Sequence, residues 1–375
     1  MPAPFVLTRG TWPHRLLLLA IAALAVLALL WASGLAQFRV SQLTSVFIYA
    51  IAISGLNLAT GYTGLLSIGH SAFFGLGAYT TGVLVMRYNW DPLATIAPAV
   101  ALCFAVGFLI GLPALRIRGL YLALVTLAVG VAFPELVRRF SSLTGGARGL
   151  VIRRRLLNPP PWSGFGPGER TQWLFWLSAV TLGAVLLLVH LLVRSRAGLA
   201  MVATRDNEIA AAASGVRVAT VKTSVFGLSG AVTGLAGCLF AMYLAALSPD
   251  GSFTLLKSIE FITGLVIGGA ATRLGPVVGA FAVVYIPYLT SSLNPSNVSQ
   301  GQLSGVLFGV VLILIIFLMP DGVVGGLSRL SGRLVQLRPA RVNTPTPPAP
   351  EENNHEASPL PGGRDDRDLT ARGVQ

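Results

Sequence analysis

The sequence has few charged residues: Asp, Glu, Lys and Arg occupy only 11% of its 375 positions, while 54% are hydrophobic. Soluble domains carry about a quarter charged residues, so this composition excludes an ordinary soluble protein. Apolar runs of about 20 residues, long enough to cross the hydrocarbon core as helices, recur along the chain. The sequence therefore predicts an all-α, polytopic helical membrane protein.

Lysine is almost absent. The two lysines, Lys222 and Lys257, follow Val and Leu, so the chain has no Gly-Lys pair. A phosphate-binding P-loop requires that pair, which excludes a P-loop ATPase site in this sequence. We also find no Ser-His-Asp order, histidine cluster or cysteine pair that would indicate an enzyme. We expect no enzyme activity and no cofactor in this chain, and any ATP would be bound by partner subunits.

Cysteine is equally scarce. Cys103 and Cys238 lie inside apolar runs, with no second Cys or His at ligand spacing. We interpret them as small buried residues, neither a disulfide nor a metal site. The net charge of +13 comes from Arg and Lys scattered over the loops. Cytoplasmic loops of membrane proteins accumulate such residues, so we expect contact with membrane lipid and no nucleic-acid partner.

We predict about ten membrane spans. They cover residues 16–36, 43–60, 65–86, 94–112, 119–137, 172–193, 223–247, 259–272, 275–290 and 302–319. With the N-terminus in the cytoplasm, an even number of spans returns the C-terminus there. This topology puts 17 of the 27 basic residues inside and 10 outside. The first apolar run is longer than a signal-peptide core and is expected to be retained, with cleavage as the alternative.

Two segments outside the spans are distinctive. The predicted external loop 138–171 carries three consecutive arginines (153–155), which form either a solvated face or a docking surface for an acidic external partner. Its Pro- and Gly-rich stretch 158–169 predicts non-helical surface structure. The segment 339–375 is rich in Pro and charge and predicts a disordered cytoplasmic tail, which leaves 1–338 as the transmembrane domain.

The spans fall into two blocks of four, residues 43–137 and 223–319, that enter the membrane from opposite sides. Thr63-Gly64-Leu65 in the first block has a similar tripeptide in the second, Thr263-Gly264-Leu265. Inverted repeats of this kind build transporters around a pathway at the membrane midplane. Chance similarity between Gly-rich membrane sequences is the alternative. The eighth span is short and Gly-rich, which predicts a broken or re-entrant segment.

Three ionisable residues in the spans are candidates for ion coupling, because buried ionisable groups mark ion-driven carriers. Glu135 precedes Arg138 by three residues, and Glu260 follows Lys257 by three, so each favours a local ion pair. For His70 we expect an interhelical hydrogen bond, with a pathway role as the alternative. The sequence therefore offers few candidate residues for coupling transport to an ion gradient.

The stretch "RDNEIAAAASGVRVATVK" (205–222) is too polar to cross a bilayer. Asp206 or Asn207 is a suitable helix N-cap, Glu208 falls in the first turn, and Gly215 favours a left-handed C-terminal cap. We predict a short helix that contacts another protein through Arg205, Asp206 and Glu208. An amphipathic connector on the membrane surface is the alternative, although the bulky apolar face of interfacial helices is missing.

This stretch resembles the cytoplasmic coupling-helix segment of bacterial ABC importer permeases of the branched-chain amino-acid type, often called LivM-like. Further similar passages are "GLNLATGYTGLLSIGHSAFFGLGAYTTGVL" (55–84), "RIRGLYLALVTLAVG" (116–130), "SIEFITGLVIGGAATRLGPVVGAF" (258–281) and "MPDGVVGG" (319–326). The resemblance covers about residues 40–330. The chain departs from the family pattern at 270–273, where a second Gly-x-Gly-like turn is usual, and in its long tail.

The resemblance implies a permease subunit in the bacterial inner membrane that moves branched-chain or related amino acids by alternating access. Its implied partners are a second related permease, two ATP-binding subunits and an external substrate-binding protein. Within the coupling loop 194–222, Arg205, Asp206, Glu208 and Gly215 match the segment that docks on the ATPase. Import of urea or short amides, an ion-driven secondary transporter and a passive channel are the alternatives.

Polar and small residues in the two blocks are candidates for the substrate pathway. They are Asn57, Thr60, Ser67, His70 and Ser71 in the first block and Thr263, Gly268 and Gly269 in the second. Hydroxyl, amide and exposed backbone groups at these positions could meet a solute. Hydrogen bonding between packed helices is the alternative role for each of them.

Overall fold

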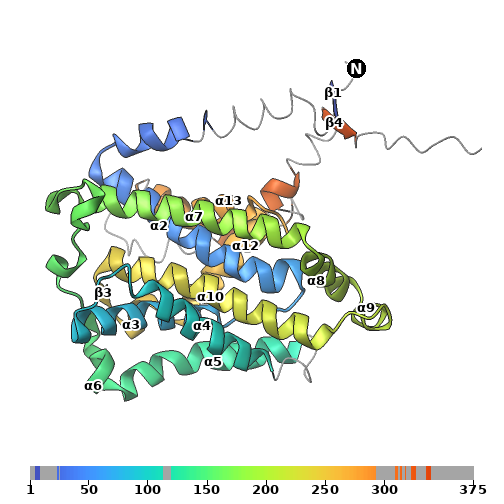
Figure 1. Cartoon of the computed structure of the whole chain (residues 1–375), viewed down its shortest axis with the longest axis horizontal. Coiled ribbons are helices and arrows are strands. Elements are labelled where there is room, and N and C mark those ends of the chain that lie inside the picture. The colour runs from blue at the N-terminus through green and yellow to red at the C-terminus, as the bar shows by residue number, and fades with distance from the viewer. Residues whose placement is uncertain are drawn as a thin grey trace, which may run out of the picture.

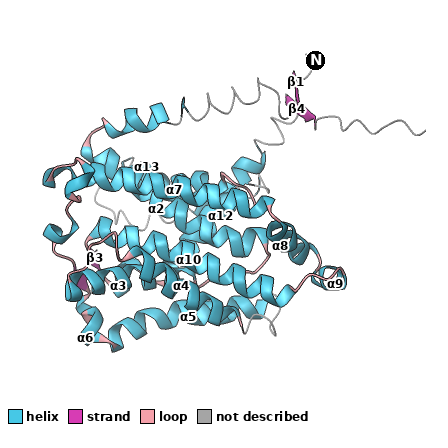
Figure 2. Cartoon of the chain, in the orientation of Figure 1, coloured by secondary structure: helices cyan, strands magenta, loops and turns pink. Residues whose placement is uncertain are grey.

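A computed structural model describes residues 5–8, 23–24, 26–112, 120–292, 335–338 and scattered positions between 309 and 326. Nearly all of the described chain is helical (Figure 2). The predicted tail 339–375, most of span ten and part of span one lie outside the described residues.

Besides the helical residues 26–33 and 322–326, the described chain contains twelve α-helices with defined bounds, a π-helical segment, four short 3-10 turns and four short strands. The α-helices are α2 (Gln37–Leu56), α3 (His70–Tyr88), α4 (Ile96–Gly111), α5 (Leu120–Arg139), α6 (Ser141–Thr144), α7 (Arg170–Arg194), α8 (Arg196–Asp206), α9 (Glu208–Ala213), α10 (Val218–Leu244), α11 (Pro249–Ser252), α12 (Leu255–Gly268) and α13 (Gly275–Ser292). The π segment Asn57–Tyr62 continues α2. The strands are β1 (Phe5–Thr8), parallel to β4 (Val335–Arg338), and β2 (Leu150–Val151), antiparallel to β3 (Ala246–Leu247).

Five described helical segments are long and apolar enough to cross a membrane: 37–62, 121–139, 170–194, 218–244 and 249–268. Two shorter apolar helices, α4 and α13, accompany them. These segments coincide with predicted spans because length and hydropathy alone decide both. The chain is therefore an all-helical membrane protein, as its composition predicts.

The long helices run side by side between two ends, with α6 and β3 at one end and α8 and α9 at the other (Figure 1). Helix α10 lies at the centre, packed on α2, α3 and α4. Glycine makes this close packing possible. A Cβ added at Gly77 would lie 2.0 Å from the Gly234 carbonyl oxygen, and one at Gly237 would lie 1.9 Å from that of Phe74. Small residues hold α3 and α10 together, as is common in membranes.

The helix contacts support an inverted repeat. Helices α2, α3 and α4 of the first block correspond to α10, α12 and α13 of the second. Each contact has an exchanged counterpart: α10 packs on α4 as α2 packs on α13, and α10 packs on α3 as α2 packs on α12. The two leading helices are each followed by a left-handed residue, Gly64 (φ +73°) and Ala245 (φ +60°).

The similar tripeptides are not structurally equivalent, so that part of the repeat prediction is wrong. Thr63-Gly64-Leu65 forms the turn after α2, whereas Thr263-Gly264-Leu265 lies inside α12. Gly264 serves packing instead, because a Cβ there would lie 2.5 Å from Ile53. The same three residues therefore meet two different requirements, a turn after α2 in the first block and close helix packing in the second.

Five local predictions need correction. Span three begins as a helix at His70, not at residue 65, because Leu65–Gly69 is non-helical. There the Ile68 amide donates to the Thr126 hydroxyl instead of a helical carbonyl. Helix α8 replaces the expected loop before 205. Span eight ends at Gly268, and span seven begins at Val218. The stretch 158–169 contains short 3-10 turns at 161–163 and 167–169.

Candidate functional site

The segment predicted to contact another protein forms the tip of one end of the bundle (Figure 1). Asn207 leaves helical geometry and separates α8 from α9. Its side-chain oxygen accepts hydrogen bonds from the amides of Ile209 and Ala210, both at 3.0 Å. Asn207, not Asp206, is therefore the N-cap of α9, and Asp206 is the last residue of α8. Gly215 follows α9 with φ +85°, as the sequence predicts for the cap.

Two contacts fasten this tip to the membrane helices. The Glu208 carboxylate lies 2.8 Å from the Lys222 ammonium group, which is buried near the start of α10. Arg205 pairs with Asp206 at 2.9 Å and donates to the Gly61 carbonyl oxygen at the end of α2. The tip is thus attached to both α2 and α10, the leading helices of the two blocks.

The outward face of the tip is open. Arg205, Asp206 and Asn207 are exposed, and Ile209 is 72% exposed. A polar hollow of about 190 Å³ lies between these residues and the turn at 63–66. An exposed isoleucine that follows three exposed or half-buried polar residues fits contact with another protein better than burial in lipid. The face lacks the broad apolar stripe by which helices lie in the interface.

At the centre of the bundle, His70 joins three helices. Its Nδ1 lies 2.7 Å from the Ser67 hydroxyl, and its Nε2 lies 2.7 Å from the Ser229 hydroxyl. Ser229 donates its only proton to the Gly55 carbonyl oxygen at 2.6 Å. It must therefore accept from His70, which places the histidine proton on Nε2 and makes Ser67 the donor to Nδ1. The predicted interhelical hydrogen bond of His70 is confirmed.

The N-termini of α3 and α12 meet beside this histidine. The Ser71 amide donates to the Ser258 hydroxyl at 2.8 Å, and that hydroxyl donates to the Ser71 hydroxyl at 2.7 Å. Because Ser229 lies near the middle of α10, both helix starts lie deep in the bundle. Corresponding helices of the two blocks therefore touch at their first turns.

The remaining predicted pathway residues bond to backbone groups of nearby turns or are buried in the helix packing. Asn57 donates to the Thr272 carbonyl oxygen and accepts from the Ala271 amide, both at 2.9 Å. Thr60 donates to the Leu65 carbonyl oxygen. Thr263 and Gly268 are buried, and a Cβ at Gly268 would lie 1.9 Å from the Gly275 carbonyl oxygen. Gly269 ends α12 with φ +104°. These contacts define the local packing, while a role in the pathway stays a prediction.

Glu135 and Glu260 make the local ion pairs expected from the sequence. Glu135 pairs with Arg138, which also pairs with Asp250 before α12. Glu260 pairs with Lys257 at 2.6 Å, and Lys257 also donates to the Tyr49 hydroxyl at 3.1 Å. The sequence did not reveal that Lys257 reaches across to Tyr49 on α2, or that Glu260 lines a hollow. Its signal was a charge on either side of the predicted start of span eight, with Lys257 before residue 259 and Glu260 just after it.

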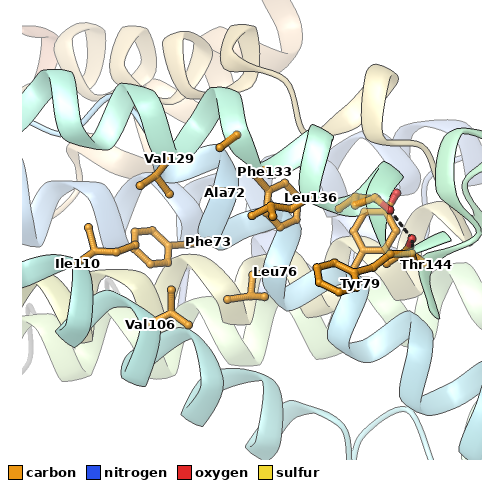
Figure 3. A pocket seen from close by; sticks show the side chains of 13 residues that line it. Ala72, Phe73, Leu76, Tyr79, Val106, Ile110, Val129, Phe133, Leu136 and Thr144 are labelled. Atoms are coloured by element: carbon orange, nitrogen blue, oxygen red, sulfur yellow. Dashed lines mark hydrogen bonds between the residues drawn. The ribbon is translucent and has the colours of Figure 1, made fainter. Parts of the chain in front are cut away.

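A cavity of about 420 Å³ lies between α3, α4 and α5. Phe73, Val106, Ile110, Val129 and Phe133 are among its walls (Figure 3). Thr144 lies at one end, and its hydroxyl donates to the Val137 and Phe140 carbonyl oxygens. No charged residue lines this cavity. Its chemistry suits an apolar occupant and offers nothing to hold a charged solute.

Comparison with known proteins identifies the family. The family described as "Branched-chain amino acid transport system / permease component" matches residues 38–316. The chain belongs to this family. The relatives include the high-affinity branched-chain amino acid transport system permease protein LivM of Escherichia coli K12, 30% identical over 322 residues that cover 81% of this chain and 74% of that protein.

Two further relatives show the range of this permease family. The LivM protein of Methanocaldococcus jannaschii, named as a branched-chain amino acid transport permease, is 22% identical and covers 74% of this chain and 90% of its own. The ribose import permease RbsC of E. coli K12 is 25% identical, and the match covers 70% of this chain and 79% of RbsC. A solved inward-facing metal-chelate type ABC transporter covers 82% of this permease and 99% of its own chain, with 18% identity and a TM-score of 0.41.

Family membership confirms the resemblance to LivM-like permeases. The protein is a permease component of an ABC-type transport system, which makes it a membrane transport subunit. Such permeases work in a complex with ATP-binding subunits and a substrate-binding protein.

Proposed function

We propose that this permease is the membrane-spanning subunit of an ATP-driven importer that carries branched-chain or related amino acids across the bacterial inner membrane by alternating access. A second related permease, two ATP-binding subunits and an external substrate-binding protein complete the transporter. The described chain supplies the pathway and the connection to the ATP-binding subunits, while hydrolysis takes place on those partners.

The arrangement of α9 carries this proposal. The helix is capped at both ends, exposed on its outer face, and fastened to α10 through Glu208 and Lys222. A force applied to α9 by a closing ATP-binding subunit therefore reaches α10, the most buried of the long helices. Rigid-body movement of packed helices is the established form of such switching.

The amino-acid substrate rests on the relatives. The LivM protein of E. coli matches 81% of this chain at 30% identity, while the ribose permease matches 70% at 25%. This difference favours amino acids over other solutes of the same importer class. Urea and short amides stay as alternatives that a panel of solutes separates in uptake measurements.

The coupling proposal is tested with Glu208→Arg and Gly215→Pro in the complete transporter. An arginine at 208 would face Lys222 and repel it, and proline cannot adopt the φ of +85° found at 215. We expect both variants to insert in the membrane, to lose most of the co-purifying ATP-binding subunit, and to lose at least nine-tenths of uptake.

Gly183→Ala is the matched control, because a Cβ at that position of α7 meets nothing within 4 Å. It should retain both the ATP-binding subunit and uptake. Normal uptake and normal co-purification in the Glu208 and Gly215 variants would show that α9 is a passive connector.

A further inference from the structure

One member of an ion pair, Glu260, lines a hollow of about 290 Å³ between α2, α12 and α13. Glu260 and Tyr49 line it, and Lys257 donates to both of them. Ser45 lies on one wall, and Val283, Val284 and Pro287 make the opposite wall apolar. The volume is close to the lower end of the roughly 300–1,000 Å³ usual for small-molecule sites.

The pair lies deep within the bundle, as two independent contacts show. Tyr49, its hydrogen-bond partner, is at the middle of the continuous helix 37–62. Ser258, the residue after Lys257, bonds to Ser71 at the start of α3, next to the histidine that contacts the middle of α10. Both markers place the charges near the midplane and away from the bundle ends.

Charges at this depth are costly, and lipid cannot be the neighbour of this hollow. The Glu260 side chain is 38% exposed on the surface of the described chain. A charged side chain at the bilayer centre costs several kcal/mol when it faces hydrocarbon, so such residues face protein or water. The face formed by α2, α12 and α13 must therefore lie toward another protein surface or an aqueous path, and not toward lipid.

The chemistry of the hollow matches one class of solute. We propose that it is a binding site for a zwitterionic amino acid with an aliphatic side chain, an inference that rests on the proposed role in amino-acid import. Lys257 receives the carboxylate and Glu260 the ammonium group, while Val283 and Val284 contact the aliphatic side chain. Lys257 exchanges the Glu260 carboxylate for the carboxylate of the solute, and Glu260 exchanges the Lys257 ammonium group for that of the solute. Neither protein charge is therefore left unpaired.

This site also separates amino acids from the other solutes considered. Urea and short amides have no net charges to replace those of Lys257 and Glu260 when the ion pair opens. A site that must break a buried ion pair rejects a solute that leaves the two charges uncompensated. The same physical reason disfavours sugars at this hollow.

The test is thiol labelling of Ser45→Cys in the assembled transporter in membranes, with a charged thiosulfonate reagent that reacts only from water. The parent chain gives the background, because Cys103 and Cys238 are buried. Val180→Cys, on the exposed surface of α7 at 67%, is the control for a position facing lipid. We expect Ser45→Cys to react and Val180→Cys to stay unlabelled.

L-Leucine should protect Ser45→Cys from the reagent. Its analogues with one charged group, 4-methylpentanoate and 3-methylbutylamine, should protect at least tenfold less well, because each leaves one protein charge unpaired. Adding Lys257→Met or Glu260→Gln should raise the half-protecting leucine concentration at least tenfold. Adding Glu135→Gln, which removes an ion pair of the same i,i+3 spacing at the end of α5, should leave it unchanged.

Absence of labelling at Ser45→Cys, or labelling that leucine leaves unchanged, would overturn the site. Equal protection by the uncharged 3-methylbutanamide would overturn its zwitterion chemistry. Each result is independent of the coupling proposal, which is measured by co-purification of the ATP-binding subunit. A transporter that retains that subunit and shows no leucine protection would contradict this inference alone.

Discussion

Single hydroxyl groups connect the two halves of this permease. Ser229 on α10 accepts from His70 on α3 and donates to the Gly55 carbonyl oxygen on α2. All three groups are buried. A neutral histidine held between two hydroxyls positions helices and leaves no proton to relay. The network therefore argues for a structural role at this point of the bundle.

Replacing Ser229 with alanine should destabilise the transporter. The change leaves the His70 Nε2–H and the Gly55 carbonyl oxygen without this partner, and an unsatisfied buried polar group costs about 1–3 kcal/mol. We expect a lower midpoint of thermal unfolding in detergent. Ser224→Ala on the same helix is the control, because that exposed hydroxyl bonds only to Thr220 within α10. Equal midpoints for the two variants would show that the network contributes nothing.

Among the elements, α10 connects the tip of the coupling segment with the centre of the bundle. Lys222, near its start, pairs with Glu208, and Ser229, two turns further, binds His70. Both residues lie on one helix, so a displacement of α9 is carried directly to the first turn of α3. Helices packed through backbone contact at Gly77 and Gly234 have little room to absorb that movement.

Lys222→Met should uncouple transport from hydrolysis. The outer face of α9 stays available to the ATP-binding subunit, while the link between α9 and α10 is lost. We expect the subunit to co-purify and to hydrolyse ATP, with uptake reduced about tenfold or more per ATP consumed. Lys222→Arg keeps a cation near Glu208 and should retain most of the uptake. If Lys222→Met lost the ATP-binding subunit, the ion pair between Glu208 and Lys222 would serve only to stabilise the fold of α9.

The sequence predicted elements well where length and hydropathy decide them, and poorly where tertiary contacts do. Helices α4, α5 and α7 begin and end within a few residues of their predicted spans. The late start of α3 was not predictable, because the segment before it is held by Thr126 from a distant helix. The hollow at Lys257 was missed for the same reason, since an i,i+3 spacing reveals the pair but not its neighbour Tyr49.

At the scale of the whole molecule, the two ends of the bundle differ in chemistry. One end carries α8 and α9, which are fastened to α2 and α10 and open outward. The other carries α6, the 3-10 turns of 138–171 and the paired strands β2 and β3, with exposed arginines at 153–155. The proposed coupling to ATP-binding subunits requires the first end to face the cytoplasm, and we then expect the second end to face the substrate-binding protein.

Thiol labelling from each side of the membrane tests this orientation. Arg154→Cys and Ser214→Cys place thiols at exposed positions of the two opposite ends. In intact cells, a membrane-impermeant maleimide should label Arg154→Cys and spare Ser214→Cys, and inside-out vesicles should reverse the pattern. Labelling of both from one side would contradict the two-ended bundle itself. The opposite pattern would place α9 on the side away from the cytosol. Because ATP is hydrolysed in the cytosol, no ATP-binding subunit could then act on that helix.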